Sequence, residues 1–522
     1  MTSIRKAQIV GSPPDAGRMK IILEDGLIKA ITPEDDAPIA SDAIDADGAW
    51  VHPGFVDAHV HLVMSGLAMH NLDLTGVASR EEFESRIAQR HETLPEGEWL
   101  LANGWLEGDW GSSVLPDSSW LQAAGARPVV CWKRDQHAAL VNEPVLQLLE
   151  GQDAPPGGTF VTDNQGRRSG VLLEAAAWEL VIPLIPEPSI QQQREQTLQA
   201  TRHLASKGVV AVGAMEYVQT TNDVIDPIRD ELATGVMVTI LDRTLPLDAA
   251  LEQAQTIHND DRLAVIGCKA FLDGTFGSRT AAMLEEFSND PGNSGMLVEL
   301  AQRGELETWI RAVVDQGYSP SMHAIGDRAV RLALDAADIA DDHASRHDRT
   351  RQLIRIEHCQ MVHPDDAPRF AGRVASMQPL HVRDDGRWAK EKLGQERMQE
   401  LFPIRSLADS GAILAFGSDW PIAPPDPIEA IRAAIDGCDH DQHNVIPHGT
   451  IDAKTALDAH TNGARLALGM PPAQLAPGGP ADLVLLDTDP HTADWLERPP
   501  RVLATIFQGR LTYDGTTQEA ST

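Results

Sequence analysis

The stretch Phe55-Val56-Asp57-Ala58-His59-Val60-His61 decides how the rest of the sequence is interpreted. It has the pattern of a buried apolar strand that ends in two histidines. Residues i and i+2 of a strand point to the same face, so His59 and His61 would present both imidazoles on one side. Neutral imidazole is a common metal ligand, and zinc accepts nitrogen and oxygen donors. The pair therefore favours a metal site, with hydrogen-bonded core histidines as the alternative.

Four further candidate ligands lie at or near the ends of later apolar runs: Lys269, His323, His358 and Asp419. A (β/α)8 barrel uses about 30 residues per βα unit. His323 and His358 are 35 residues apart, or one unit, and His358 and Asp419 are 61 apart, or two units. Lys269 precedes His323 by 54 residues, which is one unit with a longer loop. If the first histidine pair ends strand 1, these residues end strands 4, 5, 6 and 8.

Apolar runs at similar intervals supply the barrel strands, at residues 209–212, 237–241, 264–269, 353–358, 374–377 and 412–416. Helical patterns such as 327–340 and 427–436 lie between them. Strands that alternate with helices indicate a parallel sheet with helices outside. The sequence therefore predicts an α/β fold, a (β/α)8 TIM barrel, with all candidate ligands at the carboxyl ends of strands, where barrel active sites lie.

The chain is longer than a barrel alone requires. His61 and Lys269 are 208 residues apart, although three βα units need roughly 90. We therefore expect a large insert after strand 1, at about residues 65–200. Short apolar pieces and turns at residues 1–52 and 471–522 predict a small composite β-sandwich built from both chain ends. Residues 53–470 would form the barrel with its insert.

The expected insert contains six of the eleven tryptophans. One interpretation is that these side chains build the insert's own core. The functional hypothesis is that one or two of these tryptophans line a substrate pocket above the barrel mouth. Trp105 and His137 of the insert would then lie close to the metals. Large flat side chains there would suit an apolar or aromatic part of a substrate.

The net charge limits which macromolecules the protein could bind, and the cysteine content indicates its compartment. The net charge is −34, from 77 acidic and 43 basic residues, which argues against nucleic acids and anionic membranes. No apolar stretch is long enough to span a membrane, and residues 1–20 show no secretory signal. Four cysteines without C-x-x-C spacing suggest buried thiols in a reducing compartment, so a cytoplasmic location is expected.

Motifs along most of the chain carry a family resemblance. They are residues 52–62 (HPGFVDAHVHL), Gly104-Trp105, 269–281 (KAFLDGTFGSRTA), 323–327 (HAIGD), 355–360 (RIEHCQ), 378–381 (QPLH), 417–421 (GSDWP) and 478–483 (GGPADL). In this order and spacing, the sequence resembles the amidohydrolase superfamily, specifically the YtcJ-like branch that includes N-substituted formamide deformylase. No ligand of the pattern is missing.

The resemblance implies a barrel with a composite β-sandwich and two divalent metal ions, with zinc expected. It implies that Lys269 is carboxylated and bridges the metals; an unmodified ammonium between two dications would be strongly repelled. A hydroxide held between the metals would attack a carbon–nitrogen bond of a small molecule, not a peptide bond. Asp419 would act as general base and then general acid. His381, which could help to hold the oxyanion, His137 and Trp105 are candidate substrate contacts.

Several alternatives stay open at this stage. Lys269 could be a snorkelling lysine with an acidic partner, and Asp419 could be a turn residue. A one-metal deaminase of the same superfamily would need a glutamate acid on its own strand and would not need Lys269. A barrel without catalytic activity could bind a small ligand for regulation. A homodimer is a candidate assembly.

Overall fold

The protein forms two compact units in the computed structural model, which describes residues 2–13, 17–40, 43–110, 115–134, 138–155, 158–241, 245–347 and 349–515. One unit comprises Met1–Ser65 and Thr197–Thr522, and the other comprises Gly66–Gln196. The second unit corresponds to the insert expected at about 65–200. His137 lies outside the described residues.

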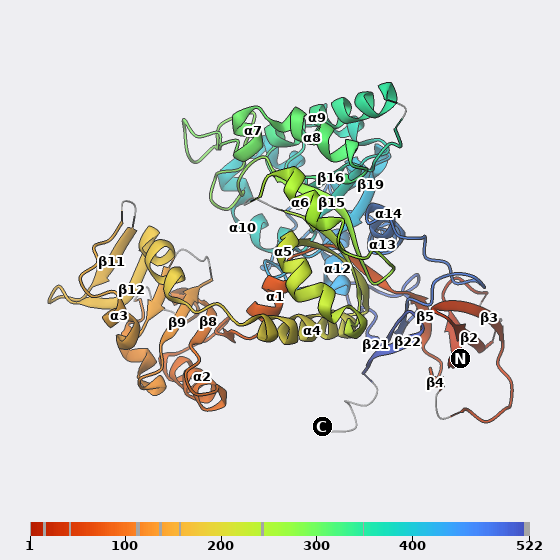
Figure 1. The fold of residues 1–522 in the computed structure, drawn as a ribbon, viewed down its shortest axis with the longest axis horizontal. Coiled ribbons are helices and arrows are strands. Elements are labelled where there is room, and N and C mark those ends of the chain that lie inside the picture. Colours follow the sequence, from red (N-terminus) through yellow and green to blue (C-terminus); the bar gives the residue numbers. More distant parts are fainter. Residues whose placement is uncertain are drawn as a thin grey trace. The chain divides into compact units, whose positions relative to one another are not determined.

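The first unit contains a parallel barrel of eight described strands, in the sheet order β19-β18-β17-β16-β15-β14-β13-β6 (Figure 1). The strands are β6 (Phe55–Val60), β13 (Val209–Glu216), β14 (Gly235–Ile240), β15 (Leu263–Phe271), β16 (Ser319–Ala324), β17 (Arg355–His358), β18 (Val374–Met377) and β19 (Ile413–Phe416). The α/β fold with a nearly closed (β/α)8 barrel that the strand spacing predicts is confirmed.

Burial on both faces explains why these strands are continuous apolar runs. Every residue of β6, β13 and β14 is buried, as expected when helices cover the outside of a sheet whose inside is also packed. Gly213 lets β13 approach β6 closely, because a Cβ at this position would lie 2.3 Å from the carbonyl oxygen of Ala58. Larger residues there would push the two strands apart.

Helices follow the strands and cover the barrel. Those of the first unit are α5 (Val218–Thr220), α6 (Leu247–Ala254), α7 (Glu299–Arg303), α8 (Leu306–Asp315), α9 (Asp327–Arg346), α10 (His381–Leu393), α11 (Ile404–Asp409), α12 (Pro427–Asp436), α13 (Ala453–Ala459) and α14 (Asn462–Ala467). Two helices cross the boundary between the units along the chain, α1 (Leu62–Ala68) and α4 (Ile190–Ser206).

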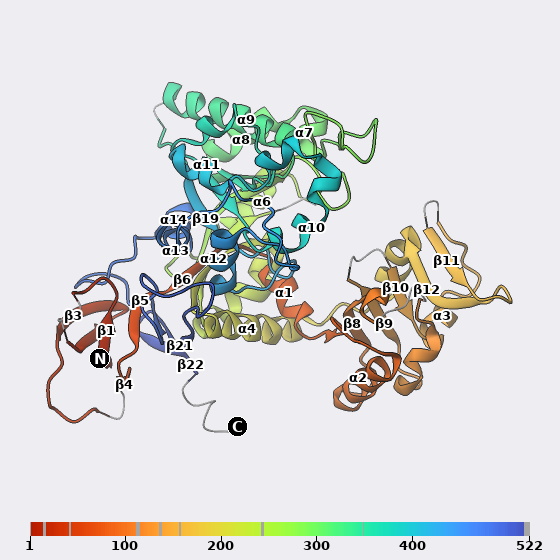
Figure 2. The same ribbon diagram turned by 180° about the vertical axis from the view of Figure 1, so that it is seen from behind.

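Both chain ends contribute to a second sheet of the same unit, in the order β22-β21-β20-β5-β1-β2-β3, with β4 paired to β1 (Figure 2). Its strands are β1 (Thr2–Ile9), β2 (Met19–Glu24), β3 (Leu27–Pro33), β4 (Ile44–Asp45), β5 (Trp50–Pro53), β20 (Leu483–Leu486), β21 (Val502–Phe507) and β22 (Arg510–Asp514). Side chains from both ends, such as Ile4, Val51 and Ile506, share one apolar core.

The insert has its own six-stranded sheet, in the order β11-β12-β10-β9-β8-β7. The strands are β7 (Leu72–Asp73), β8 (Leu100–Trp105), β9 (Val129–Lys133), β10 (Ala138–Val141), β11 (Gly158–Thr162) and β12 (Arg168–Glu174), and the helices are α2 (Arg80–Thr93) and α3 (Glu143–Leu148). Phe83 of α2, Trp105 and Trp120 belong to one apolar cluster, and Trp132 belongs to another.

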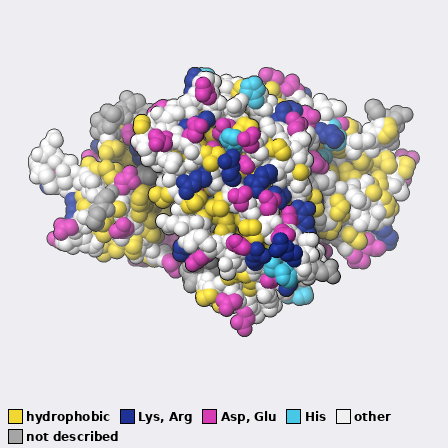
Figure 3. Space-filling view, turned by 90° about the horizontal axis from the view of Figure 1, so that it is seen from above, with side chains coloured by type: hydrophobic (Ala, Val, Ile, Leu, Met, Phe, Trp, Pro, Cys, Tyr) yellow, Lys and Arg dark blue, Asp and Glu magenta, His cyan; other side chains and the backbone are white. Residues whose placement is uncertain are grey.

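Charged side chains of both signs share the surface. On the face drawn in Figure 3, basic side chains are interspersed with acidic ones. Many arginines pair with aspartates; Arg369, for example, contacts Asp335 and Asp338. Among the described residues, no helix combines the length and the apolar character that crossing a membrane requires.

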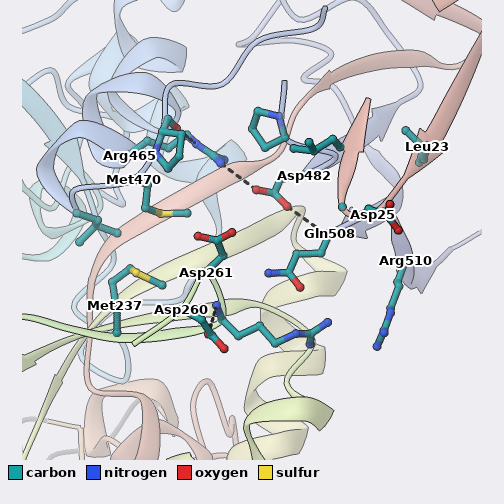
Figure 4. A pocket seen from close by; sticks show the side chains of 18 of the residues that line it. Leu23, Asp25, Met237, Asp260, Asp261, Arg465, Met470, Asp482, Gln508 and Arg510 are labelled. Atoms are coloured by element: carbon teal, nitrogen blue, oxygen red, sulfur yellow. Dashed lines mark hydrogen bonds and ion pairs between the residues drawn. The ribbon is translucent and has the colours of Figure 1, made fainter. Parts of the chain in front are cut away.

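A cavity of about 850 Å3 opens where the chain-end sheet meets the amino ends of barrel strands β14 and β15 (Figure 4). On its wall, Asp482 accepts a hydrogen bond from Arg465 Nη2 at 2.8 Å and one from the backbone N–H of Gln508 at 3.0 Å. The Arg465 and Asp482 side chains are only 1% and 7% exposed. This buried ion pair therefore joins helix α14 of the barrel to the chain-end sheet.

We predict that Asp482→Ala lowers the free energy of unfolding of this unit by about 3–5 kcal/mol, because it leaves the Arg465 guanidinium buried without its counter-charge. The measurement is urea or thermal unfolding. Asp342→Ala is the matched control, since Asp342 pairs with Arg346 at the exposed surface and should leave the midpoint unchanged. Equal midpoints for both variants would contradict a structural role of the buried pair.

Candidate metal centre

The barrel closes at the point where the candidate ligands of its first and last strands meet. Asp419 donates its backbone N–H to the His59 carbonyl at 2.7 Å, and His61 donates to the Trp420 carbonyl at 2.8 Å. Gly417 permits this approach, because a Cβ there would lie 2.6 Å from the backbone nitrogen of His59. His358 and Asp419 have left-handed φ values of 75° and 59°, a strained backbone that is typical of functional sites.

Side-chain atoms from five of the six candidates converge directly above this closure. Ligand atoms of His59, His358 and Asp419 all lie within 4.8 Å of one another. Asp419 Oδ1 is 3.4 Å from both His59 Nε2 and His61 Nε2. Lys269 Nζ is 3.1 Å from His59 Nε2. The structure thus brings together residues that the sequence separates by up to 360 positions.

His323 is adjacent to this group. Its ring centroid lies 4.5 Å from that of His358. Its Nε2 donates to the Gly274 carbonyl at 3.1 Å and lies 3.6 Å from Asp273 Oδ1, so Nδ1 is the nitrogen that keeps a lone pair for a metal. The carboxylate of Asp273 accepts backbone N–H groups of Ile325, Gly326 and Ala282, which fixes the loops around this histidine.

The other two buried histidines follow the same rule. His59 Nδ1 donates to Glu357 Oε2 at 2.7 Å, and His358 Nδ1 donates to Gln378 Oε1 at 2.8 Å. In both rings Nε2 is therefore the nitrogen with the lone pair. Metal-ligating histidines commonly donate their second ring N–H to an oxygen acceptor, which sets the tautomer and the ring orientation. All three arrangements fit this requirement.

Burial keeps these rings neutral. It is the main cause that lowers the pKa of His59 to about 4 and that of His323 to about 3, and the positive charge of Lys269 adds to both effects. The pKa of His358 also lies well below its usual value, through burial and the neighbouring His323. Neutral imidazole is the form that binds metals, so the site holds its ligands ready at physiological pH.

A buried ion pair between Arg355 and Glu357 fixes the orientation of the His59 ring. Glu357 is fully buried and accepts hydrogen bonds from Arg355 Nε at 2.8 Å and Ser321 Oγ at 2.5 Å, in addition to the bond from His59. Arg355 Nη2 also donates to the Ala58 carbonyl at 2.7 Å. Burial opposes ionisation of Glu357, but Arg355 and His59 outweigh it and hold its pKa well below the usual value.

The pKa values of the two aspartates of the centre are shifted in opposite directions. Burial raises the pKa of Asp57 to about 7, although it accepts backbone N–H groups of Ser418 and His59. Burial also opposes ionisation of Asp419, but the hydrogen bond with His61, the first of the effects that favour the carboxylate, helps to hold the Asp419 pKa well below its usual value. Asp419 is therefore the carboxylate that is available to bind a cation or to take part in proton transfer.

Sequence reasoning assigned no role to the supporting residues Asp57, Asp273, Arg355, Glu357 and Gln378. One signal was present: Arg355 and Glu357 interrupt an apolar strand directly before His358, and a charged residue in a buried strand normally has a partner. Nothing in the sequence identified that partner as His59, which lies 298 residues away.

The predicted substrate contacts have different placements. Trp105 is fully buried in the insert's own apolar cluster, where its Nε1 donates to the Cys131 carbonyl at 2.8 Å. This placement agrees with the alternative that the tryptophans build the insert core. His381 begins α10, directly after the turn that follows β18. A substrate contact by His137 stays a prediction, because this residue is outside the described part of the chain.

A second group of potential ligands, Asp439, Asp441 and His443, lies on the loop after α12. Asp439 Oδ1 accepts the backbone N–H groups of Asp441 and His443, each at 2.9 Å. These bonds account for the group as a turn, and Asp441 and His443 are exposed. The chemistry of the chain is therefore centred on the carboxyl end of the barrel.

Comparison with known proteins agrees with this geometry. A family model described as "Amidohydrolase family" matches residues 42–513. "Protein LONG AFTER FAR-RED 3" of Arabidopsis thaliana is 33% identical over 494 residues, which cover 90% of this chain and 83% of that protein. "Putative amidohydrolase YtcJ" of Bacillus subtilis is 26% identical and covers 95% and 96% of the two chains.

Two further matches cover nearly the whole chain. "N-substituted formamide deformylase" of Arthrobacter pascens is 23% identical over 91% of this chain and 90% of its own. The crystal structure of an uncharacterized metal-dependent hydrolase from Pyrococcus furiosus has a TM-score of 0.73 at 24% identity and covers 94% of this chain and 100% of that one. This likeness shows that the fold is shared.

We predict that Gln378→Met weakens metal binding about 10- to 100-fold, because it removes the acceptor that sets the tautomer of His358. Competition with a chromogenic chelator measures the affinity. Gln378→Glu is the matched control, since it keeps an oxygen acceptor of similar size and should retain most of the affinity. Metal binding by the methionine variant that equals the unmodified protein would show that His358 needs no such support.

Proposed function

The chain belongs to the amidohydrolase family and is a metal-dependent hydrolase, and we propose that it cleaves a non-peptide, amide-type carbon–nitrogen bond of a small molecule. One observation carries this proposal. Three buried, neutral imidazoles each have one nitrogen held by an oxygen acceptor. Two of them, His59 and His358, lie within ligand distance of the Asp419 carboxylate, and His323 packs against His358. Such a donor set suits divalent metal ions and hydrolytic chemistry.

The proposed ligands of two divalent ions, with zinc expected, are His59, His61, Lys269, His323, His358 and Asp419. Bound metals would supply Lewis acidity towards a carbonyl oxygen and would lower the pKa of a water. The position of Lys269 supports its role, because its Nζ faces the metal-binding nitrogen of His59 at 3.1 Å. A carboxylated Lys269 would replace this cation with two anionic oxygens and so complete the ligand set.

Asp419 is the proposed proton carrier. Its carboxylate lies 3.4 Å from His61 Nε2 and is held in place by the backbone bonds that close the barrel. It would take a proton from the attacking water and pass it to the leaving nitrogen, as general base and then general acid. The water oxygen would first add to the carbonyl carbon; the carbon–nitrogen bond would then break as the carbonyl reforms, giving the acid, and the amine would leave with the proton.

Relatives and residues favour this proposal over its alternatives. The name of the Arthrobacter pascens relative describes removal of a formyl group from a substituted formamide, which is cleavage of such a bond. A one-metal deaminase would not need Lys269 among the ligands. Glu357, the glutamate nearest to them in the sequence, is already engaged by Arg355, Ser321 and His59. A ligand-binding barrel without activity would not need an ionised Asp419.

We predict two divalent metal ions per chain, because six ligand residues that include a lysine exceed what one ion uses. Elemental analysis of protein purified without chelator, with bicarbonate supplied to allow carboxylation of Lys269, measures the stoichiometry. Lys269→Ala is expected to hold fewer ions. A ratio that stays at one under these conditions would favour the one-metal deaminase.

We predict that Asp419→Asn folds normally but loses about 10²- to 10⁴-fold in turnover, because asparagine keeps the size of the side chain but cannot accept a proton. Steady-state kinetics on a panel of N-acyl and N-formyl compounds, together with the unfolding midpoint, test this. Asp409→Asn at an exposed position of α11 is the matched control. Near-normal turnover of Asp419→Asn would remove this residue from proton transfer.

A further inference from the structure

Three buried polar atoms that follow barrel strands β17 and β18 have no hydrogen-bond partner among the described residues: Gln360 Oε1, Gln378 Nε2 and His381 Nε2. Buried polar atoms are almost always paired, so each of these marks a place where a water, an ion or a bound molecule can form the missing hydrogen bond. All three belong to amide or imidazole groups close in sequence to the metal centre.

Gln360 is held rigidly. It follows His358 by two residues, is 2% exposed, and its carbonyl accepts the backbone N–H of Phe402 at 2.7 Å. Its side-chain Nε2 lies 2.9 Å from Asp385 Oδ2 and 3.4 Å from His381 Nδ1. His381 and Asp385 are one turn apart on α10, so they lie on the same side of the helix and one amide group reaches both.

The direction of these bonds determines the state of the imidazole. An amide nitrogen can only donate, and it has two hydrogens. One goes to the Asp385 carboxylate, so the other is directed at His381 Nδ1, which must accept it with a lone pair. A ring whose Nδ1 accepts a hydrogen bond carries its proton on Nε2, the atom without a partner. His381 also donates its backbone N–H to the Gln378 carbonyl at 3.1 Å, which anchors the residue beside the metal ligands.

We propose that Gln360, oriented by Asp385, is a positioning residue that directs the Nδ1 lone pair of His381 towards its own amide and so leaves a ring proton on Nε2, where it donates a hydrogen bond to the carbonyl oxygen of the substrate. This inference rests on the proposed function, because it needs a substrate with an oxygen acceptor at the reacting carbon. His381 follows strand β18 and Asp419 follows strand β19, which pair side by side in the barrel. The donor and the proton carrier thus lie at the same end of neighbouring strands.

The substrate class follows from the same atoms. Gln360 Oε1 would accept a substrate N–H, and Gln378 Nε2 and His381 Nε2 would donate to substrate oxygens. An amide, formamide or urea group presents both kinds of atom without a net charge. The two amides carry no charge, so they provide no counter-charge for a carboxylate at this position. An uncharged amide-type group is therefore the expected occupant.

The tautomer can be read directly in the full-length, metal-loaded protein. Histidine labelled with ¹⁵N gives distinct ring shifts for protonated and unprotonated nitrogens, and the signal lost in His381→Phe assigns this residue. We expect the proton on Nε2 in the unmodified protein. Gln360→Glu offers only acceptors, so it should move the proton to Nδ1 or protonate both nitrogens. A proton on Nδ1 before substitution, or a ring unchanged by Gln360→Glu, would overturn the inference.

Kinetics test the link to catalysis with a second variant. Gln360→Met should lower kcat by about 10²- to 10³-fold with little change in KM, the loss typical of one donor to a developing oxyanion. In a His381→Phe background the same substitution should cause almost no further loss, because both changes remove one interaction. If the kcat losses of the two substitutions multiply, Gln360 acts independently of His381, and its role as a positioning residue for that imidazole is refuted.

Two further variants separate the possible failures. Gln302→Met at an exposed position of α7 is the control and should leave kcat unchanged. Asp385→Leu removes the oxygen that orients Gln360 and should shift the ring proton of His381, so an unchanged tautomer in this variant would refute the orientation by Asp385. If no carbon–nitrogen compound is hydrolysed by the unmodified protein, the proposed function fails, while the ring shifts still decide whether Gln360 sets the tautomer.

Discussion

The hydrogen bonds that join the end of strand β6 to the turn after strand β19 are the constraint on which the centre depends. They run between backbone groups of His59 and Asp419 and of His61 and Trp420. Because backbone groups form them, the ligand side chains stay unoccupied by the closure itself. Gly417 is required at this point, since any side chain would collide with His59. The same contacts therefore close the barrel and position the ligands.

Burial gives this centre its chemical character. A charged imidazole would be costly in such surroundings, so His59, His323 and His358 stay neutral, and each uses one nitrogen to satisfy an oxygen acceptor. The acceptors differ in kind: a carboxylate, a backbone carbonyl and an amide oxygen. The shared result is three lone pairs directed away from the supporting groups, beside a carboxylate that remains ionised.

The fold was largely accessible from the sequence. Strands buried on both faces are continuous apolar runs, and the spacing of the candidate ligands matched the repeat of a βα unit, so the barrel and the positions of its strands could be predicted. The insert was visible as excess length, but its internal structure was not. Trp105 illustrates the limit: the sequence offered both a substrate pocket and the insert's own core for it, and the structure places it in an apolar cluster of the insert.

The sequence by itself determined which residues could ligate metals, because histidines, a lysine and an aspartate at strand ends are local features. Only the tertiary structure decided how these residues are supported. Glu357 reaches His59 across 298 positions, and Gln360 meets His381 and Asp385 through the pitch of α10. Such pairs depend on which strands become neighbours and on which side of a helix faces them. Packing of the whole chain sets those relations, and no local pattern encodes them.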